Sequence, residues 1–289
     1  MKSSSLKILI ALLFLLASAF FAFKTLGLYS SKNIFTDEEI SEAVKVINEK
    51  GVKIKEQSVI KEKSVPNVIK LEFNSISSES IAKRLMREEY GSFTIPDGFS
   101  YTNDTESLSF SKNYDLEYIY LPSDVTKDKV TTALALINGS DEAGEKAVKK
   151  LTEAFFKNIN SDPYKVSLKL KKSVTNGSLT YLEAVQCVDS YEIEGAGVIV
   201  ALNSDKPVYI SGKLFFAESY NDYETDAFDS INILFEIEKS DLEIRSMELI
   251  YAVVFDKKSS VYLTPSYRLS YSDGSVKIYD ATSAAKRSS

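Results

Sequence analysis

An uncharged apolar run near the amino terminus constrains this chain more than any other feature. Between residues 8 and 23 the only polar side chain is Ser18, and the apolar character continues past Lys24 to Tyr29. As a helix, residues 8–29 would be about 33 Å long, which is enough to cross the roughly 30 Å apolar layer of a bilayer. We therefore expect an N-terminal transmembrane helix.

A cleaved signal peptide is the alternative interpretation of the same segment. Lys2 and Lys7 would form its basic part, and Ala17-Ser18-Ala19 its small-residue cleavage site, with cleavage near Ala19. Phenylalanines at positions 20, 21 and 23 prolong the apolar run beyond that site, which favours the anchor. In the favoured topology the N-terminus is cytoplasmic, and residues 30–289 are extracytoplasmic on the cell membrane.

Small residues lie on one side of the expected membrane helix. Ala11, Ser18 and Ala22 are separated by offsets of seven and four, a spacing that places them on a common face. Such a face allows another helix to approach closely, so these residues are candidates for pairing with a partner helix in the membrane. A chance distribution of small residues in the span is the alternative.

The composition removes most catalytic chemistry. The chain has no histidine and a single cysteine, Cys187, so catalytic triads that use histidine, intrachain disulfides and thiolate zinc sites cannot form. A net charge of −6 argues against sequence-independent nucleic-acid binding. We expect no catalytic residues, no cofactor and no metal ion, and we therefore expect a protein that is not an enzyme.

Three local patterns could suggest an active or metal site. Ser58 with Lys61, and Ser80 with Lys83, match the Ser-x-x-Lys pattern of penicillin-binding enzymes, but that family's other elements are missing. Acidic residues between Asp222 and Asp229 lack the glycine and the distal glutamate of a calcium loop. Chance matches and helix capping explain these patterns better.

Hydrophobic periodicity predicts an alternation of helices and strands. Thr36 and Glu39 form a capping box, and the pattern after it predicts a helix over residues 37–50. Residues 127–137 fit either a helix or a strand. Helices are also expected over 78–90, after Gly139, and over 227–238 with Asp226 as its cap. Strands are expected over 52–59, 68–73, 108–110, 116–120, 165–174, 179–189, 197–202, 207–216, 247–255, 261–271 and 276–279.

The order of these elements predicts an α+β fold. One helix followed by antiparallel strands occurs at Thr36, again at Asp141 and again at Asp226, which indicates duplicated helix-plus-antiparallel-sheet units behind the transmembrane helix. The expected domains are an anchor and linker over 1–35, an α+β domain over 36–140, a strand-rich α+β domain over 141–281, and a flexible tail over 282–289.

Several long segments resemble a known family. They are FTDEEISEAVKVINEKGVKI after the span, TYLEAVQCVDSYEIEGAGVIVAL in the middle, and DAFDSINILFEIEKSDLEIRSMELIYAVVF followed by VYLTPSYRLSYSDGSVKIYDA at the end. With these segments the chain resembles the YycH/YycI family of membrane-anchored regulatory proteins of two-component systems in Gram-positive bacteria, and is closer to YycI. The resemblance implies an extracytoplasmic adaptor whose transmembrane helix contacts a sensor histidine kinase and whose body pairs with a sister YycH-like protein.

Tyr262, Tyr267 and Tyr271 form our candidate protein interface near the carboxyl end. These tyrosines are expected to share one strand face with Leu269, so they are alternatively half-buried residues of the sheet. The expected function is regulation of a sensor histidine kinase through the membrane helix and through contacts of the body. The alternative is an exported binding module for a cell-wall, peptide or lipid ligand.

Overall fold

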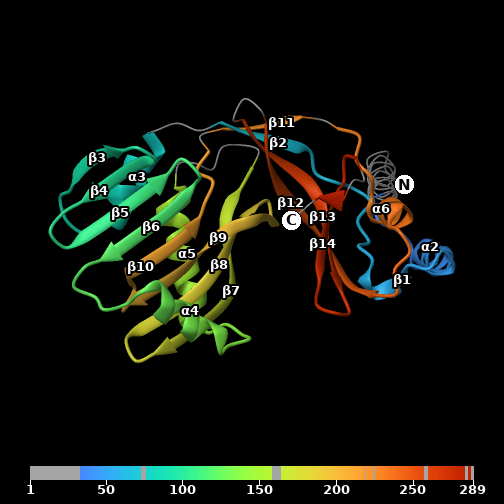
Figure 1. Ribbon diagram of the computed structural model, residues 1–289, viewed down its shortest axis with the longest axis horizontal. Helices are drawn as coiled ribbons and strands as arrows, with labels where there is room; N and C mark the ends of the chain where they lie inside the picture. The colour runs from blue at the N-terminus through green and yellow to red at the C-terminus, as the bar shows by residue number, and fades with distance from the viewer. Residues whose placement is uncertain are drawn as a thin grey trace, which may run out of the picture. The chain divides into compact units, whose positions relative to one another are not determined.

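The computed structural model describes residues 33–72, 76–157, 164–217, 219–223, 225–256, 260–283 and 286–287. These residues form a mixed α+β fold with five α-helices and a large antiparallel sheet (Figure 1). The chain divides into two compact units. The first contains the described residues up to 66, together with 226–249 and those from 265 onward, and the second contains 67–225 and 250–264. The predicted boundary at residue 140 falls inside the second unit and does not separate the two.

The first unit begins with the predicted capped helix. The side chain of Thr36 accepts the Glu39 backbone N–H at 3.1 Å, and Glu39 accepts the Thr36 N–H at 2.7 Å, which confirms the capping box. Ile40, Val44 and Ile47 of this helix are buried in the core of the unit. The elements of this unit are α2 (Asp37–Glu49), β1 (Lys53–Ile54), the 3-10 helix η1 (Glu56–Ser58), α6 (Ser230–Glu236), β14 (Val276–Asp280) and β15 (Lys286–Arg287).

The second unit contains an eight-stranded antiparallel sheet. Two meanders of four strands each meet where β6 pairs with β10, so the strand order is β3-β4-β5-β6-β10-β9-β8-β7. The strands are β3 (Gly91–Ile95), β4 (Gly98–Thr102), β5 (Glu106–Ser111), β6 (Asp115–Tyr120), β7 (Val166–Asn176), β8 (Leu179–Val188), β9 (Tyr191–Asn203) and β10 (Lys206–Lys213).

Helices cover this sheet unequally on its two faces. On one face α3 (Ile76–Leu85) and α5 (Glu142–Phe156) pack on side chains such as Leu108 and Tyr118, and together they form the main core. On the other face α4 (Lys127–Ala135) covers only one end, where Val130 and Leu134 pack near Tyr209. No other described helix covers the remainder of that face, which is called the open face below.

The remaining strands connect the elements already described. In the second unit β11 (Ser219–Tyr223) pairs with β2 (Val68–Glu72), which in turn pairs with the first residues of β13 (Val261–Tyr271). The strands β12 (Glu243–Phe255) and β13 are hydrogen-bonded neighbours, and each contributes residues to both units.

Several predicted elements need correction. The last helix begins at Ser230 with Asp229 as its N-cap, and not at Ala227 with Asp226, because the Asp229 carboxylate accepts the Asn232 N–H at 2.9 Å. Residues 52–59 form only the short β1 and the 3-10 helix η1. The ambiguous segment 127–137 is the helix α4. The strands β3, β4 and β11 were not predicted, nor was β15, which lies within the expected flexible tail.

Candidate functional site

The open face of the second unit is built from two rows of cross-strand neighbours. Directly paired residues of an antiparallel sheet point to the same side, so the register identifies each row. The first row is Phe93, Ser100, Ser109, Glu117, Ser211, Ile199 and Glu183, and the second is Ile95, Gly98, Ser111, Asp115, Lys213, Gly197 and Val185. Small and charged side chains predominate in both rows, and a face of this composition is polar and shallow.

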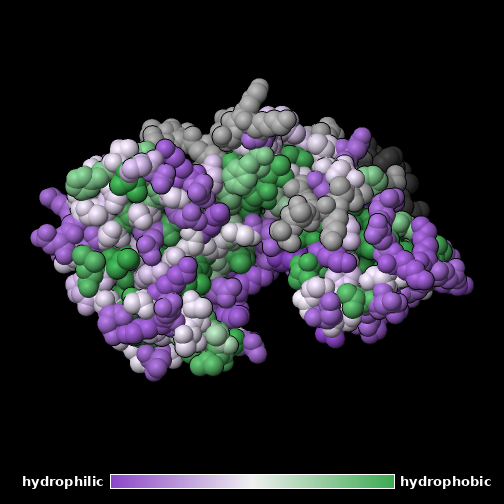
Figure 2. Space-filling view, in the orientation of Figure 1, coloured by the Kyte–Doolittle hydropathy of each residue, from purple (hydrophilic) through white to green (hydrophobic). Residues whose placement is uncertain are grey.

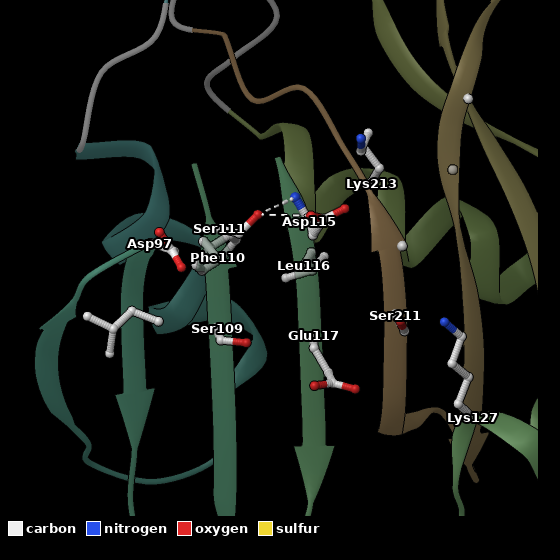
Figure 3. A pocket seen from close by; sticks show the side chains of 14 residues that line it. Asp97, Ser109, Phe110, Ser111, Asp115, Leu116, Glu117, Lys127, Ser211 and Lys213 are labelled. Carbon is white, nitrogen blue, oxygen red and sulfur yellow. Dashed lines mark hydrogen bonds between the residues drawn. The ribbon is translucent and has the colours of Figure 1, made fainter. Parts of the chain in front are cut away.

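A groove of about 560 Å³ lies on this face (Figure 3). It is lined by the cations Lys127 and Lys213 and the carboxylates Asp97, Asp115 and Glu117, among other residues. The serines of β5 and β10 and the glycines of β9 have small side chains or none, so they leave the floor of the groove low. The groove can therefore accept a polar ligand that offers both charges.

Hydrogen bonds fix the carboxylates of the groove. The Ser111 hydroxyl donates to Asp115 at 3.0 Å and accepts the Asp115 N–H at 3.1 Å, which closes the turn between β5 and β6 (Figure 3). Burial raises the pKa of the Tyr209 phenol, so this group stays protonated and donates to Glu117 at 3.3 Å. These contacts fix the orientation of the Asp115 and Glu117 carboxylates.

The strand β3 is an open edge of the same sheet. Among the residues that the structure describes it pairs only with β4, and all five of its residues, Gly-Ser-Phe-Thr-Ile, are exposed and uncharged. Phe93 is 58% exposed and Ile95 is 36% exposed. At the place of β3 and β4, Figure 2 shows apolar residues at the surface of the second unit. An unpaired edge of this kind offers its outward N–H and C=O groups to another strand.

The opposite edge of the sheet is protected by charge. The strand β7 carries Lys169, Lys171 and Lys172, and the first two bind Glu192 of β9 at 3.0 and 2.5 Å. Lysines on an edge strand discourage pairing with another chain. The contrast makes β3 the edge of this sheet that is suited to pairing.

A buried carboxylate holds the chain where it enters β3. Glu106 is fully buried and accepts the Tyr118 hydroxyl at 2.5 Å and the Arg87 backbone N–H at 2.8 Å. The Arg87 guanidinium lies 3.6 Å from the same carboxylate and donates to Pro207 O at 2.7 Å. Burial, together with the Glu106 carboxylate, raises the pKa of Tyr118, which keeps its proton for this bond. These contacts therefore hold the chain in place just before it enters β3.

The predicted interface tyrosines are separated by the structure. Tyr267 and Tyr271 are buried in the core of the first unit, whereas Tyr262 is partly exposed beside Tyr223. The expectation of one shared face with Leu269 was wrong for Tyr262, because an even position on the strand points to the other side. Of this group, only Tyr262 has a side chain that a partner can reach.

The other sequence patterns have structural roles. The Ser58 hydroxyl donates to Arg245 O at 2.8 Å, while Lys61 binds Asp37 at 2.6 Å, so this pair does not act together. Lys83 pairs with Glu79 at 2.8 Å. Across the described ranges, no group of cysteine, aspartate and glutamate side chains could hold a metal ion.

The expected membrane helix and its candidate pairing residues Ala11, Ser18 and Ala22 lie outside the described residues. Among the helices that the structure does describe, none has the length and apolar character needed to cross a bilayer.

The edge strand β3 was not predicted, although the sequence contains a signal for it. Pro96-Asp97-Gly98 is a turn sequence of the x-Pro-Asp-Gly-x kind, and it follows an alternating Phe93-Thr94-Ile95 run. Reading that turn as a hairpin would have found β3 and β4. Whether the outer strand lies open or covered depends on distant segments, which local patterns do not report.

Comparisons with known proteins add little. No protein-family model and no curated protein matches the chain. An uncharacterized protein from Eubacterium rectale has a similar structure, with a TM-score of 0.47 and 14% identity over 82% of this chain and 90% of that chain. The Bacillus megaterium YpeB C-terminal domain has a TM-score of 0.38 and 12% identity over 75% of this chain and 96% of that chain. Likenesses at this level do not indicate a function.

Proposed function

We propose that this chain is a membrane-anchored extracytoplasmic adaptor that regulates a sensor histidine kinase, without enzymatic activity, and that β3 is where its body contacts a protein partner. The observation that carries the proposal is the edge of β3, where every residue is exposed and uncharged. Natural sheets commonly protect their edges with charge or cover, so an unprotected edge favours strand addition by a partner. The resemblance to the YycH/YycI family supports the same class of function.

The proposal includes the anchor and the internal duplication. Residues 8–29 would span the membrane, with Ala11, Ser18 and Ala22 facing a helix of the kinase. In the body, α3 precedes the four strands β3–β6, and α4 and α5 precede the four strands β7–β10. We regard these two segments as copies of one helix-plus-antiparallel-sheet element, since in each a helical part precedes four consecutive strands and the two sets of strands meet edge to edge. Their bounds differ from those of the units expected at Thr36, Asp141 and Asp226.

Co-purification from membranes tests the proposal. The intact protein is compared with a version in which residues 8–29 are replaced by an unrelated span of equal length. We expect a sensor histidine kinase to be recovered with the intact protein, and less of it with the replaced span. Recovery of no kinase in either sample would contradict the proposal.

A second candidate function is favoured by the groove on the open face. The groove has a volume of about 560 Å³, and two lysines and three carboxylates are among the residues that line it. These features suit an exported binding module for a polar cell-wall or peptide ligand. Calorimetric titration of the full chain with soluble cell-wall fragments distinguishes the two functions. Heat of binding that is lost in a Lys213→Ala variant would favour the module.

A further inference from the structure

We infer that the occupant of the β3 edge is an extended segment of another protein that is apolar in its middle and basic at its ends. This inference rests on the proposed adaptor function and specifies the partner of that same edge. Three observations carry it: the exposed backbone of β3, the apolar side chains on both of its faces, and the charges that flank it.

Apolar side chains line both faces of the edge. Phe93 and Ile95 project on the open face, and Ile95 also lines the groove. On the other face Thr94 pairs with Phe99, whose side chain is 38% exposed. A strand added to β3 would therefore meet apolar surface above and below its plane, and burial of that surface stabilises the complex.

Exposed carboxylates flank β3 at both ends. Glu88 and Glu89 precede the strand, Asp97 follows it, and all three are exposed. Arg87 is turned toward Glu106 and Pro207, and Lys112 donates to the Pro96 carbonyl at 2.8 Å on the hairpin side. An incoming segment with lysine or arginine at its two ends would complement these carboxylates, and opposite charges also favour rapid association.

A second copy of this chain fits the edge less well. Antiparallel pairing of two β3 strands over all five residues centres on Phe93 and sets Glu89 of each copy against Asp97 of the other. Like charges opposite each other weaken strand pairing, and the net charge of −6 adds repulsion between copies. These charges favour a basic partner over self-association.

Synthetic peptides test the inference on the full chain in detergent micelles. The probe is fluorescein-labelled Lys-Val-Thr-Val-Thr-Val-Lys, and two comparison peptides carry glutamate at both ends or proline in place of both threonines. We expect the basic peptide to bind at least about tenfold more tightly than the acidic one at low salt, with a smaller ratio at high salt. We expect the proline peptide not to bind, because it cannot form a strand.

Protein variants place the binding on β3. Phe93→Ser should weaken binding of the basic peptide by at least about fivefold, whereas Leu121→Ser, which changes a side chain that is 56% exposed elsewhere on the unit, should leave it unchanged. The combined change Glu88→Gln, Glu89→Gln and Asp97→Asn should remove the preference for the basic peptide.

Some outcomes would overturn the inference. Equal binding of the acidic and basic peptides would overturn the charge assignment, and no effect of Phe93→Ser would overturn the location. A dimer in sedimentation analysis that Phe93→Ser dissociates would assign the edge to a second copy. If a kinase co-purifies while no peptide binds, only this inference fails. If the basic peptide binds while no kinase is recovered, the proposed kinase adaptor function fails.

Discussion

Glu106 shows how a single side chain can stabilise the region around the candidate interface. Its carboxylate is fully buried and is satisfied by the phenol of Tyr118 and by the backbone N–H and the guanidinium of Arg87, which come from two different parts of the second unit. A buried charge is tolerated only when such partners surround it, and removing the charge leaves those donors poorly matched. The residue therefore links the chain entering β3 to the middle of the sheet.

Replacing Glu106 by glutamine should destabilise the second unit. The amide has nearly the same volume, but it loses the charge and directs an N–H group toward existing donors. We expect a loss of about 3 kcal/mol in the free energy of unfolding. This loss is measured by urea denaturation, with tyrosine fluorescence as the signal for unfolding. Glu183→Gln is the matched control, since that side chain is 40% exposed on the same sheet and should change stability by less than about 0.5 kcal/mol. Equal losses in the two variants would argue against a role for Glu106 in stabilising this region.

The single thiol should be unreactive in the folded protein. Cys187 is 1% exposed, and burial raises its pKa to about 11. At pH 8 we expect it to react with a disulfide reagent at least about 100-fold more slowly than in the urea-unfolded chain. In the folded protein the fraction of thiolate is small and the reagent cannot reach the buried sulfur. The unfolded chain loses this proton first, so the thiol's contribution to stability should fall between about pH 9 and 11. Fast labelling of native protein would contradict this packing.

Only some of the side-chain contacts could be predicted from the sequence. The capping box of Thr36 and Glu39 was found from sequence because both partners are three residues apart. Cys187 lies in the strand expected over 179–189, and the apolar character of that strand is in keeping with its burial. Glu106 was not singled out, since Tyr118 and Arg87 reach it only after the strands pair. The same limit applies to Tyr267 and Tyr271, whose burial depends on α2 and α6.

At the scale of elements, the hairpin of β3 and β4 deserves the closest test. Its turn brings Gly98 so near β5 that an added Cβ would lie 1.8 Å from the Phe110 carbonyl oxygen. Only glycine fits such a close approach without moving the backbone. Hydrophobic periodicity identified α2, α5 and the strands β5 and β6, whereas β3 and β4 were missed because their alternation extends over only a few residues.

Gly98→Ala should loosen the hairpin that presents the edge. We expect a destabilisation of about 2 kcal/mol, with faster amide hydrogen exchange in residues 91–102 than in the rest of the sheet. Gly139→Ala is the control, because a Cβ at that position meets no atom within 4 Å. Unchanged exchange over residues 91–102 in Gly98→Ala would contradict this prediction and would show that the backbone can move to accommodate the added Cβ.

At the scale of the whole molecule, the division of the chain was the hardest feature to predict. Each unit is assembled from segments far apart in sequence, and β12 and β13 contribute to both. Local patterns favour consecutive domains, so a boundary at residue 140 was expected. The α+β class was predictable because helices and antiparallel strands alternate along the chain. The proposed adaptor function depends on this assembly, since the edge of β3 stays open only when no other segment covers it.

Site-specific cross-linking in cells tests the central proposal most directly. A photo-reactive amino acid is placed at Phe93 on the edge strand, and in a separate variant at Val276, which is 49% exposed in the first unit. After irradiation we predict a dominant adduct from position 93 with a sensor histidine kinase or a sister membrane protein, identified by mass spectrometry, and no such adduct from position 276. Absence of that adduct at position 93, or equal yields from both positions, would contradict an adaptor that works through β3.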